Sequence, residues 1–439
     1  LREGDQIEII FGNQNQGSPG WLMQTFCESA FTFQITVDPF ATQDFIELPS
    51  DKNPTISMVP GDPVNWKAVL PTLRRPKERF RLSLKGEDRW GNPSDRQTGQ
   101  FKIKTNLPVE GLPDVVDLKP GDFGAVIDGL FIESPGTLNI TLLDHDNKIV
   151  AKANPMVVAE SEVAHFWSDM HAQSGETIGV GTAREYFDFA RNKAFLDIAG
   201  HQGNDFQITD KFWQHLNELT LEYNEENRFM TLPGYEWSGN TGLGGDHNVW
   251  YRTENRPIYR SSRALISDRT HLENDVLSTP DLMEKLQDED AIVVAHVGGR
   301  YADIKYAHDA KLEPSVEVHS SWGTFEWILK DAFESEYRVG IVGSSDGHKG
   351  RPGAEYPGDS QFGSYGGLTC HLLPKLDRNN FFDAFRRRRH YATTGARIYL
   401  NVSAELGDEN LQIGDIVTTD ADRLNFKFDV VGTSPIERV

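Results

Sequence analysis

From about residue 160 to residue 395, the chain alternates short apolar runs with amphipathic segments of helical length. The segment TAREYFDFARNKA places four apolar residues on one helical face, and its Thr182 is suited to cap the start of a helix. Runs such as AIVVAH and SVEVHS have the length of buried strands. Repeated alternation of strand and helix predicts a parallel sheet or a β/α barrel.

The regions on either side of this segment have a different pattern. Residues 1–158 carry short alternating runs such as ERFRLSLKGEDRW, separated at short intervals by Pro and Gly, which is typical of β-sandwich domains. The stretch LKGEDRWGNPSD resembles a turn of bacterial immunoglobulin-like domains. The sequence therefore predicts one or two sandwich modules over 1–158, a β/α region over 159–395, and the start of a C-terminal sandwich over 396–439, truncated where the chain ends.

The net charge of the chain argues against nucleic acid and anionic membranes as partners. The formal net charge is −22, and a field of that sign repels nucleic acid and anionic membranes. No apolar run approaches the roughly 20 residues that span a bilayer, and the first residues lack the pattern of a signal peptide. We therefore expect a soluble protein with a small anionic substrate and no nucleic acid. Cytoplasm and periplasm both remain open, as does the oligomeric state.

The histidines are the strongest sign of chemistry. Only two cysteines occur, so a metal site in this chain must use His and carboxylate ligands. Six of the 13 histidines fall at the ends of predicted strands, the edge at which the active sites of β/α barrels form. With Glu236 and Asp346 they predict a cluster of two or three divalent ions, either Zn, Mn or Fe. The six are His171, His201, His247, His296, His319 and His348.

The stretch VGSSDGHKGRPG, residues 342–353, fits two motifs. Gly343, Ser345 and Gly347 form G-x-S-x-G, the turn that presents a serine nucleophile, whereas Asp346 and His348 form a metal-binding D-x-H. A nucleophile elbow needs a helix after the turn, and HKGRPGAEYPGD contains too much Pro and Gly to form one. The D-x-H interpretation is therefore favoured, with Ser345 as a turn residue.

The order of these motifs is similar to that of the polymerase and histidinol phosphatase (PHP) superfamily. WSDMHAQSGET resembles its opening motif, LDIAGHQGND its second-strand motif, GYEWS its Glu strand, AHVGG its internal His and GSSDGH its closing D-x-H. HFWSDMHAQSGETIG, LTCHLLPKL and RRRRHYATTGARIYL more closely resemble the DUF3604 family. The resemblance covers roughly residues 160–400. It implies a distorted seven-stranded β/α barrel of PHP type that holds two or three divalent metals and hydrolyses phosphoesters.

Carried over by motif, the resemblance implies three groups of metal ligands. Glu236 would bridge two ions, and a third ion would lie beside them. The first ion would be held by His171, Gln173, Glu236 and Asp346, the second by His247 and His296, and the third by His201 and His348.

Two residues depart from the family pattern. Gln173 stands where the second His of H-x-H is expected, and Gly200 stands where an acid precedes the second-strand His. Both put occupancy by three metals in doubt. Glu176 and Asp205 are each either a compensating ligand or a capping or loop residue.

The implied mechanism is hydrolysis by a metal-bridging hydroxide. His319 or His348 would protonate the leaving oxygen, or His319 would instead orient a metal ligand. Arg300, Lys349 and Arg351 are candidates to clamp phosphate oxygens, although each also fits a surface salt bridge.

The leading function is a metal-dependent hydrolase, specifically a phosphomonoesterase or phosphodiesterase. One alternative is a C–N or C–O bond hydrolase of amidohydrolase type, although no Lys at a strand end is placed to carry a bridging carbamate. Another is a degenerate barrel that binds metal or ligand without turnover, which the identities of Gln173 and Gly200 would explain.

Overall fold

The computed structural model describes the chain except residues 1–3, 5, 97, 357–362 and 439, and it separates into two compact units, Leu1–Val59 and Pro60–Val439. In the first unit, β1 (Glu28–Thr32) pairs with β4 (Thr55–Met58), and β2 (Thr36–Val37) pairs with β3 (Ile46–Glu47), both antiparallel. Aromatic rings pack beside β1 with centroids 4.8–6.4 Å apart. These rings belong to Phe11, Trp21, Phe31 and Phe33.

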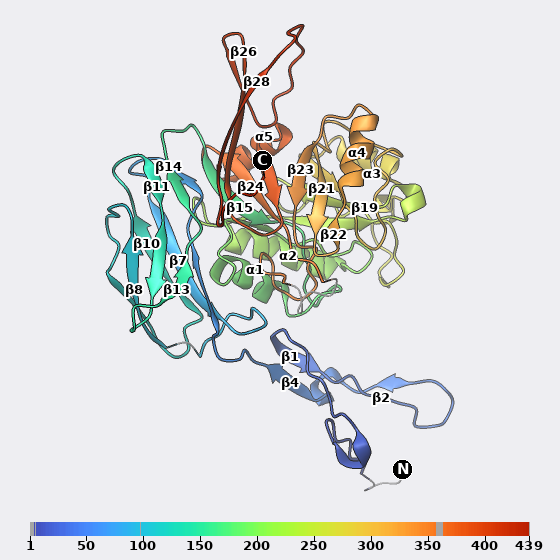
Figure 1. The fold of residues 1–439 in the computed structure, drawn as a ribbon. Helices are drawn as coiled ribbons and strands as arrows, with labels where there is room; N and C mark the ends of the chain where they lie inside the picture. Colours follow the sequence, from blue (N-terminus) through green and yellow to red (C-terminus); the bar gives the residue numbers. More distant parts are fainter. Residues whose placement is uncertain (1–3, 5, 97, 357–362, 439) are drawn as a thin grey trace. The chain divides into compact units, whose positions relative to one another are not determined.

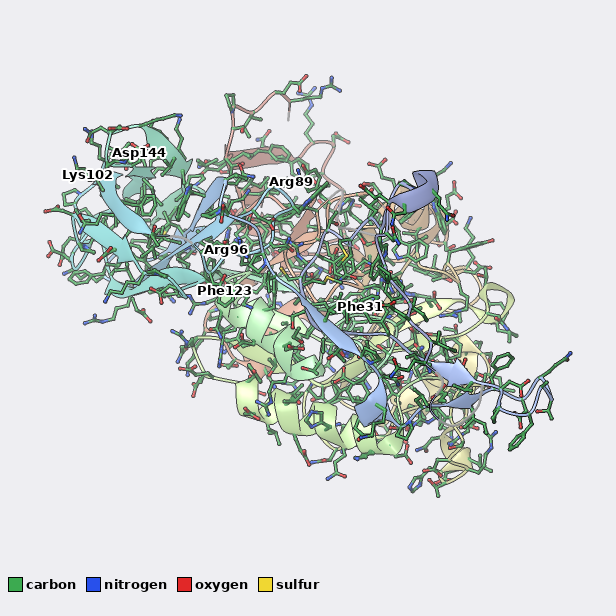
Figure 2. All side chains as sticks on the ribbon, turned by 90° about the horizontal axis from the view of Figure 1, so that it is seen from below. Phe31, Arg89, Arg96, Lys102, Phe123 and Asp144 are labelled. Carbon is green, nitrogen blue, oxygen red and sulfur yellow. The ribbon has the colours of Figure 1, made fainter. Side chains whose placement is uncertain are left out.

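The second unit begins with a β-module, residues 60–158, in which a three-stranded and a four-stranded antiparallel sheet share one hydrophobic core (Figure 1). Figure 2 labels Lys102, which lies on one inner strand of the four-stranded sheet and pairs with Leu143 on the other, and Asp144, which follows Leu143. The three-stranded sheet has the order β10 (Gly124–Leu130), β7 (Phe80–Glu87), β5 (Asn65–Val69). The four-stranded sheet has the order β13 (Ile149–Lys152), β12 (Ile140–Leu143), β8 (Gly99–Thr105), β9 (Val115–Leu118). A further small sheet has the order β11 (Gly136–Leu138), β14 (Met156–Val158), β6 (Leu73–Arg74).

The first central sheet has five strands, of which four run in the same direction and one, β24, is antiparallel to both of its neighbours. Its order is β17 (Met230–Leu232), β16 (Ile198–Gly200), β15 (Ala164–Asp169), β24 (Leu368–Leu373), β25 (His390–Thr393). The helices that accompany these strands are α1 (Ala183–Asn192), α2 (Asp210–Tyr223) and α5 (Arg378–Arg386). The predicted cap of α1 is confirmed, because the Thr182 hydroxyl accepts a hydrogen bond from the Glu185 amide in a capping box.

The second central sheet mixes antiparallel and parallel pairs. Strands β18, β19 and β20 are antiparallel neighbours, whereas β20, β21 and β23 are parallel. The order is β18 (Gly234–Ser238), β19 (Asp246–Tyr251), β20 (Ala291–Ala295), β21 (Ser315–Ser320), β22 (Gly323–Thr324), with β23 (Gly340–Gly343) also on β21. The accompanying helices are α3 (Thr279–Leu286) and α4 (Glu326–Glu334).

The prediction of a seven-stranded β/α barrel is wrong: across the described residues the sheets are small and none of them closes. A barrel requires parallel neighbours joined by crossover helices, and that requirement fails between β18 and β19. Only residues 239–245 join these strands, which is too short for a crossover, so they pair antiparallel. Two separate sheets result, and a hydrophobic cluster that includes Phe166, Ile198, Trp250 and Val294 draws on both of them.

Isolated bridges connect the two sheets where the strands end. Ala172 bridges to Gly347, and Asn204 bridges to Glu236. These bridges bring the loops after β15 and β16 against β18 and the segment after β23. Four chain segments that are far apart in sequence therefore meet at one place.

After residue 396 the chain forms a three-stranded antiparallel sheet of order β27 (Glu409–Gln412), β26 (Tyr399–Leu406), β28 (Asn425–Val431). Within the described chain, every helix is too short or too polar to cross a membrane.

We predict that Gly200→Ala destabilises the protein by about 1–3 kcal/mol, because added atoms in a packed core force neighbours to shift. A Cβ at position 200 would lie 2.8 Å from Trp250 Nε1 and 3.0 Å from the Met170 carbonyl oxygen. Chemical denaturation monitored by tryptophan fluorescence measures the change in the free energy of unfolding. The matched control is Gly242→Ala, whose Cβ would meet no atom within 4 Å. Equal stabilities of the two variants would contradict the packing argument.

Candidate metal centre

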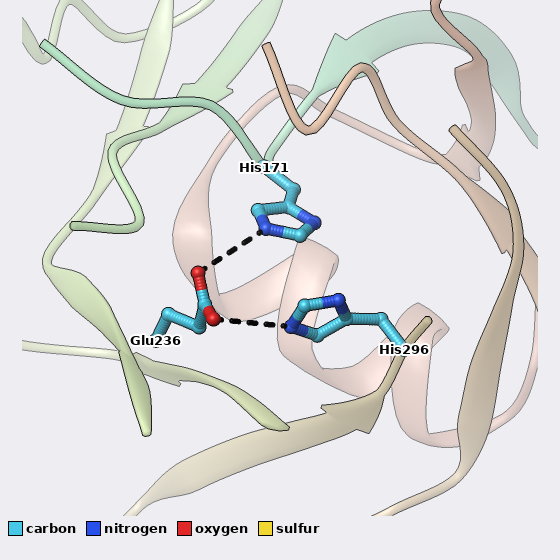
Figure 3. A group of neighbouring side chains, drawn as sticks. All are labelled: His171, Glu236 and His296. Atoms are coloured by element: carbon cyan, nitrogen blue, oxygen red, sulfur yellow. Dashed lines mark ion pairs between the residues drawn. The ribbon is translucent and has the colours of Figure 1, made fainter. Parts of the chain in front are cut away.

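Three buried side chains converge between the two central sheets: His171 after β15, Glu236 on β18 and His296 after β20 (Figure 3). His171 Nε2 lies 3.8 Å from Glu236 Oε2, and His296 Nε2 lies 3.8 Å from Glu236 Oε1. The three potential ligand atoms all lie within 4.8 Å of one another. A divalent ion with bonds of about 2.0–2.2 Å to imidazole and carboxylate fits between atoms at this spacing.

Strand periodicity explains why these side chains face one another. Tyr235 and Trp237 enter the hydrophobic core around α1 and α2, so Glu236 between them points to the opposite face of β18. On β20, Ile292 and Val294 belong to the cluster that draws on both sheets, and His296 continues the same alternation.

Three of the four imidazole nitrogens of His171 and His296 make no hydrogen bond to the part of the chain that the structure describes. Neither His171 Nε2 nor either ring nitrogen of His296 makes a hydrogen bond within the described chain, although both rings are fully buried. Buried polar atoms are rarely left unsatisfied, because removing them from water costs about 1–3 kcal/mol each. The orphaned nitrogens and the facing carboxylate therefore fit a metal ion.

Asp346 adds a second carboxylate. Its Oδ1 lies 3.2 Å from His171 Nε2, and its backbone N–H donates to the His171 carbonyl at 2.6 Å. Asp346 has a φ of 46°, a left-handed conformation that Asp adopts at some energetic cost. The surrounding loops maintain this conformation, since Gln173 N–H also donates to the Gly347 carbonyl at 2.9 Å.

Glu317 on β21 fixes the orientation of His171. The Nδ1 of His171 lies 3.0 Å and 3.2 Å from the two Glu317 carboxylate oxygens, which directs Nε2 toward Glu236 and Asp346. A carboxylate behind a metal-binding imidazole is a common arrangement, because it sets the tautomer and raises the basicity of the ligand. The sequence places Glu317 at a strand end but gives no sign of this role. Only the contact across the two sheets reveals it.

Arg300 extends from the centre to the surface. Its Nε donates to Asp246 Oδ1 at 2.8 Å, its backbone N–H donates to Asp246 Oδ2 at 2.9 Å, and Nη2 lies 3.7 Å from Glu236 Oε1. The Arg300 side chain is 31% exposed, so its guanidinium is accessible to a ligand entering from solvent.

Crowded carboxylates perturb the titration of the centre. Burial raises the pKa of Asp346 to about 7, and the charges of Glu236 and Glu317 add to this effect while His171 opposes it. Burial alone would lower the pKa of His171, but Asp346, Glu317 and Glu236 outweigh it and hold that pKa well above 6.5. Burial and neighbouring cations lower the pKa of His296. The metal-free centre therefore retains protons that a cation would replace.

The structure places several predicted ligands outside this cluster. Gln173 Nε2 donates to Glu236 Oε2 at 3.3 Å, but its oxygen accepts from Thr177, so the amide presents its nitrogen to the centre. The His201 ring contacts Ser174 through Nε2 and accepts from the Gly203 N–H through Nδ1.

His247 contacts a different carboxylate from the one in the centre. Its Nδ1 lies 2.9 Å from the Gly245 carbonyl oxygen and its Nε2 lies 3.5 Å from Glu313.

The two candidate compensating acids serve as loop and capping residues. Glu176 accepts hydrogen bonds from the Ala183 N–H at the start of α1 and from the Ser174 hydroxyl. Asp205 accepts from the backbone of Ser238 and from Ser261.

His319 is turned away from the centre. A register shift lies between Glu317 and His319 on β21, which breaks the alternation that would place both on one face. The His319 ring instead contacts the Thr324 hydroxyl at 2.7 Å and the Tyr365 carbonyl at 3.0 Å, and it lines a separate cavity of about 700 Å³.

His348 remains near the centre. Burial lowers its pKa to about 4, and the charges of Glu236 and His171 both act on it. Lys349, the next residue, lies close enough for its charge to lower the same pKa further.

Arg351 and Ser345 have structural roles. Arg351 donates to Asn92 Oδ1 at 3.1 Å and to the Gly91 carbonyl at 2.6 Å, so its guanidinium contacts a turn of the β-module rather than a phosphate site. The buried Ser345 hydroxyl donates to the His171 carbonyl at 3.2 Å and accepts from the Gly347 N–H, as expected for a turn residue.

The chain is similar to a family and to relatives without assigned activities. Residues 139–300 match the family model described as "Protein of unknown function (DUF3604)", which confirms the resemblance to DUF3604 that the motifs predict. His171, Glu236 and His296 lie inside the matched segment, whereas Glu317 and Asp346 follow it.

Similar proteins occur in Chlamydia. An uncharacterized protein of Chlamydia pneumoniae is 22% identical over 93% of this chain and 69% of the relative. An uncharacterized protein of Chlamydia trachomatis serovar D is 23% identical with the same coverage. Among solved structures, the D00-D0 domain of Intimin aligns at 10% identity with 25% of this chain and 57% of that domain, and its TM-score of 0.18 supports no inference.

We predict that the chelator-treated protein binds Zn²⁺ or Mn²⁺, and that His296→Ala and Glu236→Gln each weaken the binding at least ~100-fold. For Glu317→Ala we expect a smaller loss of affinity, about 10–100-fold, because Glu317 acts only through His171. Equilibrium dialysis with elemental analysis measures the affinity. His215→Ala, on the exposed side of α2, is the control and should bind as the wild type does. Unchanged affinity in His296→Ala would exclude this centre.

We predict that metal affinity rises with pH across pH 7. Asp346 has its pKa raised to about 7 and His171 has its pKa raised above 6.5, so below these values both hold protons that the metal must displace. For each proton that binding releases, the apparent metal affinity should rise about tenfold per pH unit below these pKa values. Calorimetric titrations at pH 6 and 8, in buffers of different ionisation enthalpy, would report the protons released. An affinity independent of pH would contradict this assignment of protonation states.

Proposed function

We propose that this protein is a metal-dependent hydrolase of small anionic esters, with phosphate esters as the leading substrate class. The observation that carries the proposal is the convergence of His171, Glu236, His296 and Asp346, with orphaned imidazole nitrogens, beside a partly exposed arginine. Imidazole and carboxylate ligands suit Zn, Mn or Fe.

A divalent ion held by these four side chains would supply a Lewis acid and would make a water molecule nucleophilic near neutral pH. The chain's own contribution is to position the ligands before substrate arrives. Glu317 orients the His171 ring, and the buried loops after β15 and β23 maintain the positions of His171 and Asp346. Preorganised groups of this kind stabilise a developing charge without a reorganisation cost during the reaction.

Arg300 is suited to bind the anionic part of the substrate. Asp246 engages its Nε and backbone N–H, which fixes the guanidinium plane beside Glu236. The remaining N–H groups of a guanidinium can donate to two oxygens of a phosphate at once. This geometry favours a substrate with a tetrahedral oxyanion over a neutral amide.

His348 is suited to accept a proton rather than to donate one. With its pKa lowered to about 4, its ring is neutral at pH 7 in the metal-free protein. A neutral imidazole can serve as a general base for an attacking water molecule, or as an additional metal ligand. The buried surroundings of His348 are therefore less consistent with the role predicted from the sequence, in which His348 protonates the leaving oxygen.

The motif resemblance to PHP phosphoesterases also supports a phosphoester substrate. It depends on the residues at the strand ends and not on a shared barrel. The D-x-H at Asp346, the Glu strand at Glu236 and the internal His296 are the elements of that resemblance that meet in the centre.

We predict that the metal-loaded protein hydrolyses p-nitrophenyl phosphate or its bis-ester and that Glu236→Gln abolishes this activity. Arg300→Ala should lower kcat/KM by about 10²–10³-fold, because it removes a donor aimed at developing charge. Release of p-nitrophenol measures the rates. Hydrolysis of p-nitrophenyl acetate or of an anilide, with no phosphate ester turned over, would reject the phosphoester class.

We predict that Ser345→Ala retains activity within about tenfold of wild type, since the Ser345 hydroxyl bonds to the His171 carbonyl and the Gly347 N–H, which are backbone groups and not metal-binding atoms. Circular dichroism of the same sample checks that the turn still folds. Complete loss of activity in a folded variant would support a serine nucleophile instead.

A further inference from the structure

A second cluster of charge lies away from the metal centre. A cavity of about 260 Å³ between the β-module and the first central sheet is lined by five arginines and three acids. It lies near Asp197 and Arg228, which precede β16 and β17, whereas His171 follows the opposite end of β15. The arginines are Arg74, Arg79, Arg81, Arg228 and Arg397, and the acids are Asp128, Asp197 and Glu225.

The three acids pair with only two of the arginines. Arg228 lies 3.2 Å from Asp128 and 3.4 Å from Glu225, and Arg81 lies 3.1 Å from Asp197. Five cations against three anions leave an excess of two positive charges in this cavity, in a chain whose formal net charge is −22.

The other three arginines donate mainly to backbone carbonyls. Arg74 donates to the carbonyls of Leu73 and His165 at 2.8 Å and 2.9 Å, and its Nε lies 3.9 Å from Glu78.

Arg397 donates to the carbonyls of Ala194 and Phe195 at 3.0 Å, and Arg79 donates to the Gly129 carbonyl at 3.1 Å. Within the described chain, neither Arg79 nor Arg397 has a carboxylate inside 4.0 Å. Carbonyls orient a guanidinium but do not neutralise its charge.

Partial burial makes this excess charge costly. Burial lowers the pKa of both Arg74 and Arg397, and the charge of Asp197 opposes this effect on both without reversing it. A charged group removed from water is stabilised by an opposite charge with matching hydrogen-bond geometry. The cavity has room for one tetrahedral oxyanion with accompanying water.

We propose that this arginine pocket is a second ligand site that binds a small divalent oxyanion, either phosphate or the dicarboxylate group of an organic acid. The site is independent of the proposed hydrolase activity, because it shares no residue with the metal centre. Its position between the β-module and the first central sheet means that an occupant would also strengthen the contact between them.

Calorimetric titration of the full chain tests the proposal, with inorganic phosphate in one series and malonate in another, at constant ionic strength. The measurements are made on chelator-treated Glu236→Gln protein, so that phosphate cannot bind through a metal ion. We expect saturable binding of one equivalent. A tenfold preference for phosphate or for malonate would identify which of the two classes the pocket takes.

Arg79→Gln in the same background should weaken binding at least tenfold. Arg79 is the more exposed of the two lining arginines that have no carboxylate within 4.0 Å in the described chain, so its replacement should preserve the fold. Arg96→Gln is the matched control: Arg96 is an exposed arginine of the same β-module, labelled in Figure 2, with a long 3.7 Å contact to Asp62. No binding of either anion, or equal binding by Arg79→Gln and Arg96→Gln, would overturn the proposal.

Discussion

Compensation of buried negative charge is the constraint on which the centre of this protein depends. Glu236, Glu317, Asp346 and Asp246 are all nearly or fully buried within one small region. Carboxylates in such surroundings either take up protons or require cations, because the desolvation cost of an unpaired charge is several kcal/mol. His171 lies between Glu317 and Asp346, and Arg300 pairs with Asp246, which accounts for part of the charge. A divalent ion between the two histidines and Glu236 would compensate much of what remains.

Several charged side chains near the candidate metal centre hold its loops in place and are not candidate ligands themselves. Asp205 and Arg351 are buried and Glu176 is exposed, yet each of these charged residues anchors a loop through backbone hydrogen bonds. Gly200, where the PHP motif that the sequence resembles has an acid, has no room for one because the Trp250 indole and the Met170 carbonyl occupy the space. Packing thus accounts for a glycine at position 200, and the centre at His171, Glu236 and His296 forms without an acid there.

Charge is distributed unevenly over the molecule. Acidic side chains concentrate around the candidate metal centre, whereas the arginine pocket lies beside residues that precede β16 and β17. The two arrangements require opposite occupants, a cation in one and an anion in the other. Both follow from the same physical rule, since a partly desolvated charge is stabilised by a close partner of opposite sign.

The sequence by itself determined the local features of this protein. The helix α1 and its Thr182 cap were predictable because capping and amphipathic periodicity act within a few residues. His171, Glu236, His296 and Asp346 were identified as candidates because they terminate or interrupt apolar runs.

Only the tertiary structure decided how the strands pair and which histidines meet. The short 239–245 connection makes β18 and β19 antiparallel, so two open sheets form in place of a barrel. A single register shift on β21 separates His319 from Glu317, and contacts between the sheets give Glu317 its role behind His171. The contact between Glu317 and His171 joins residues 146 positions apart, and no short sequence pattern carries information of that kind.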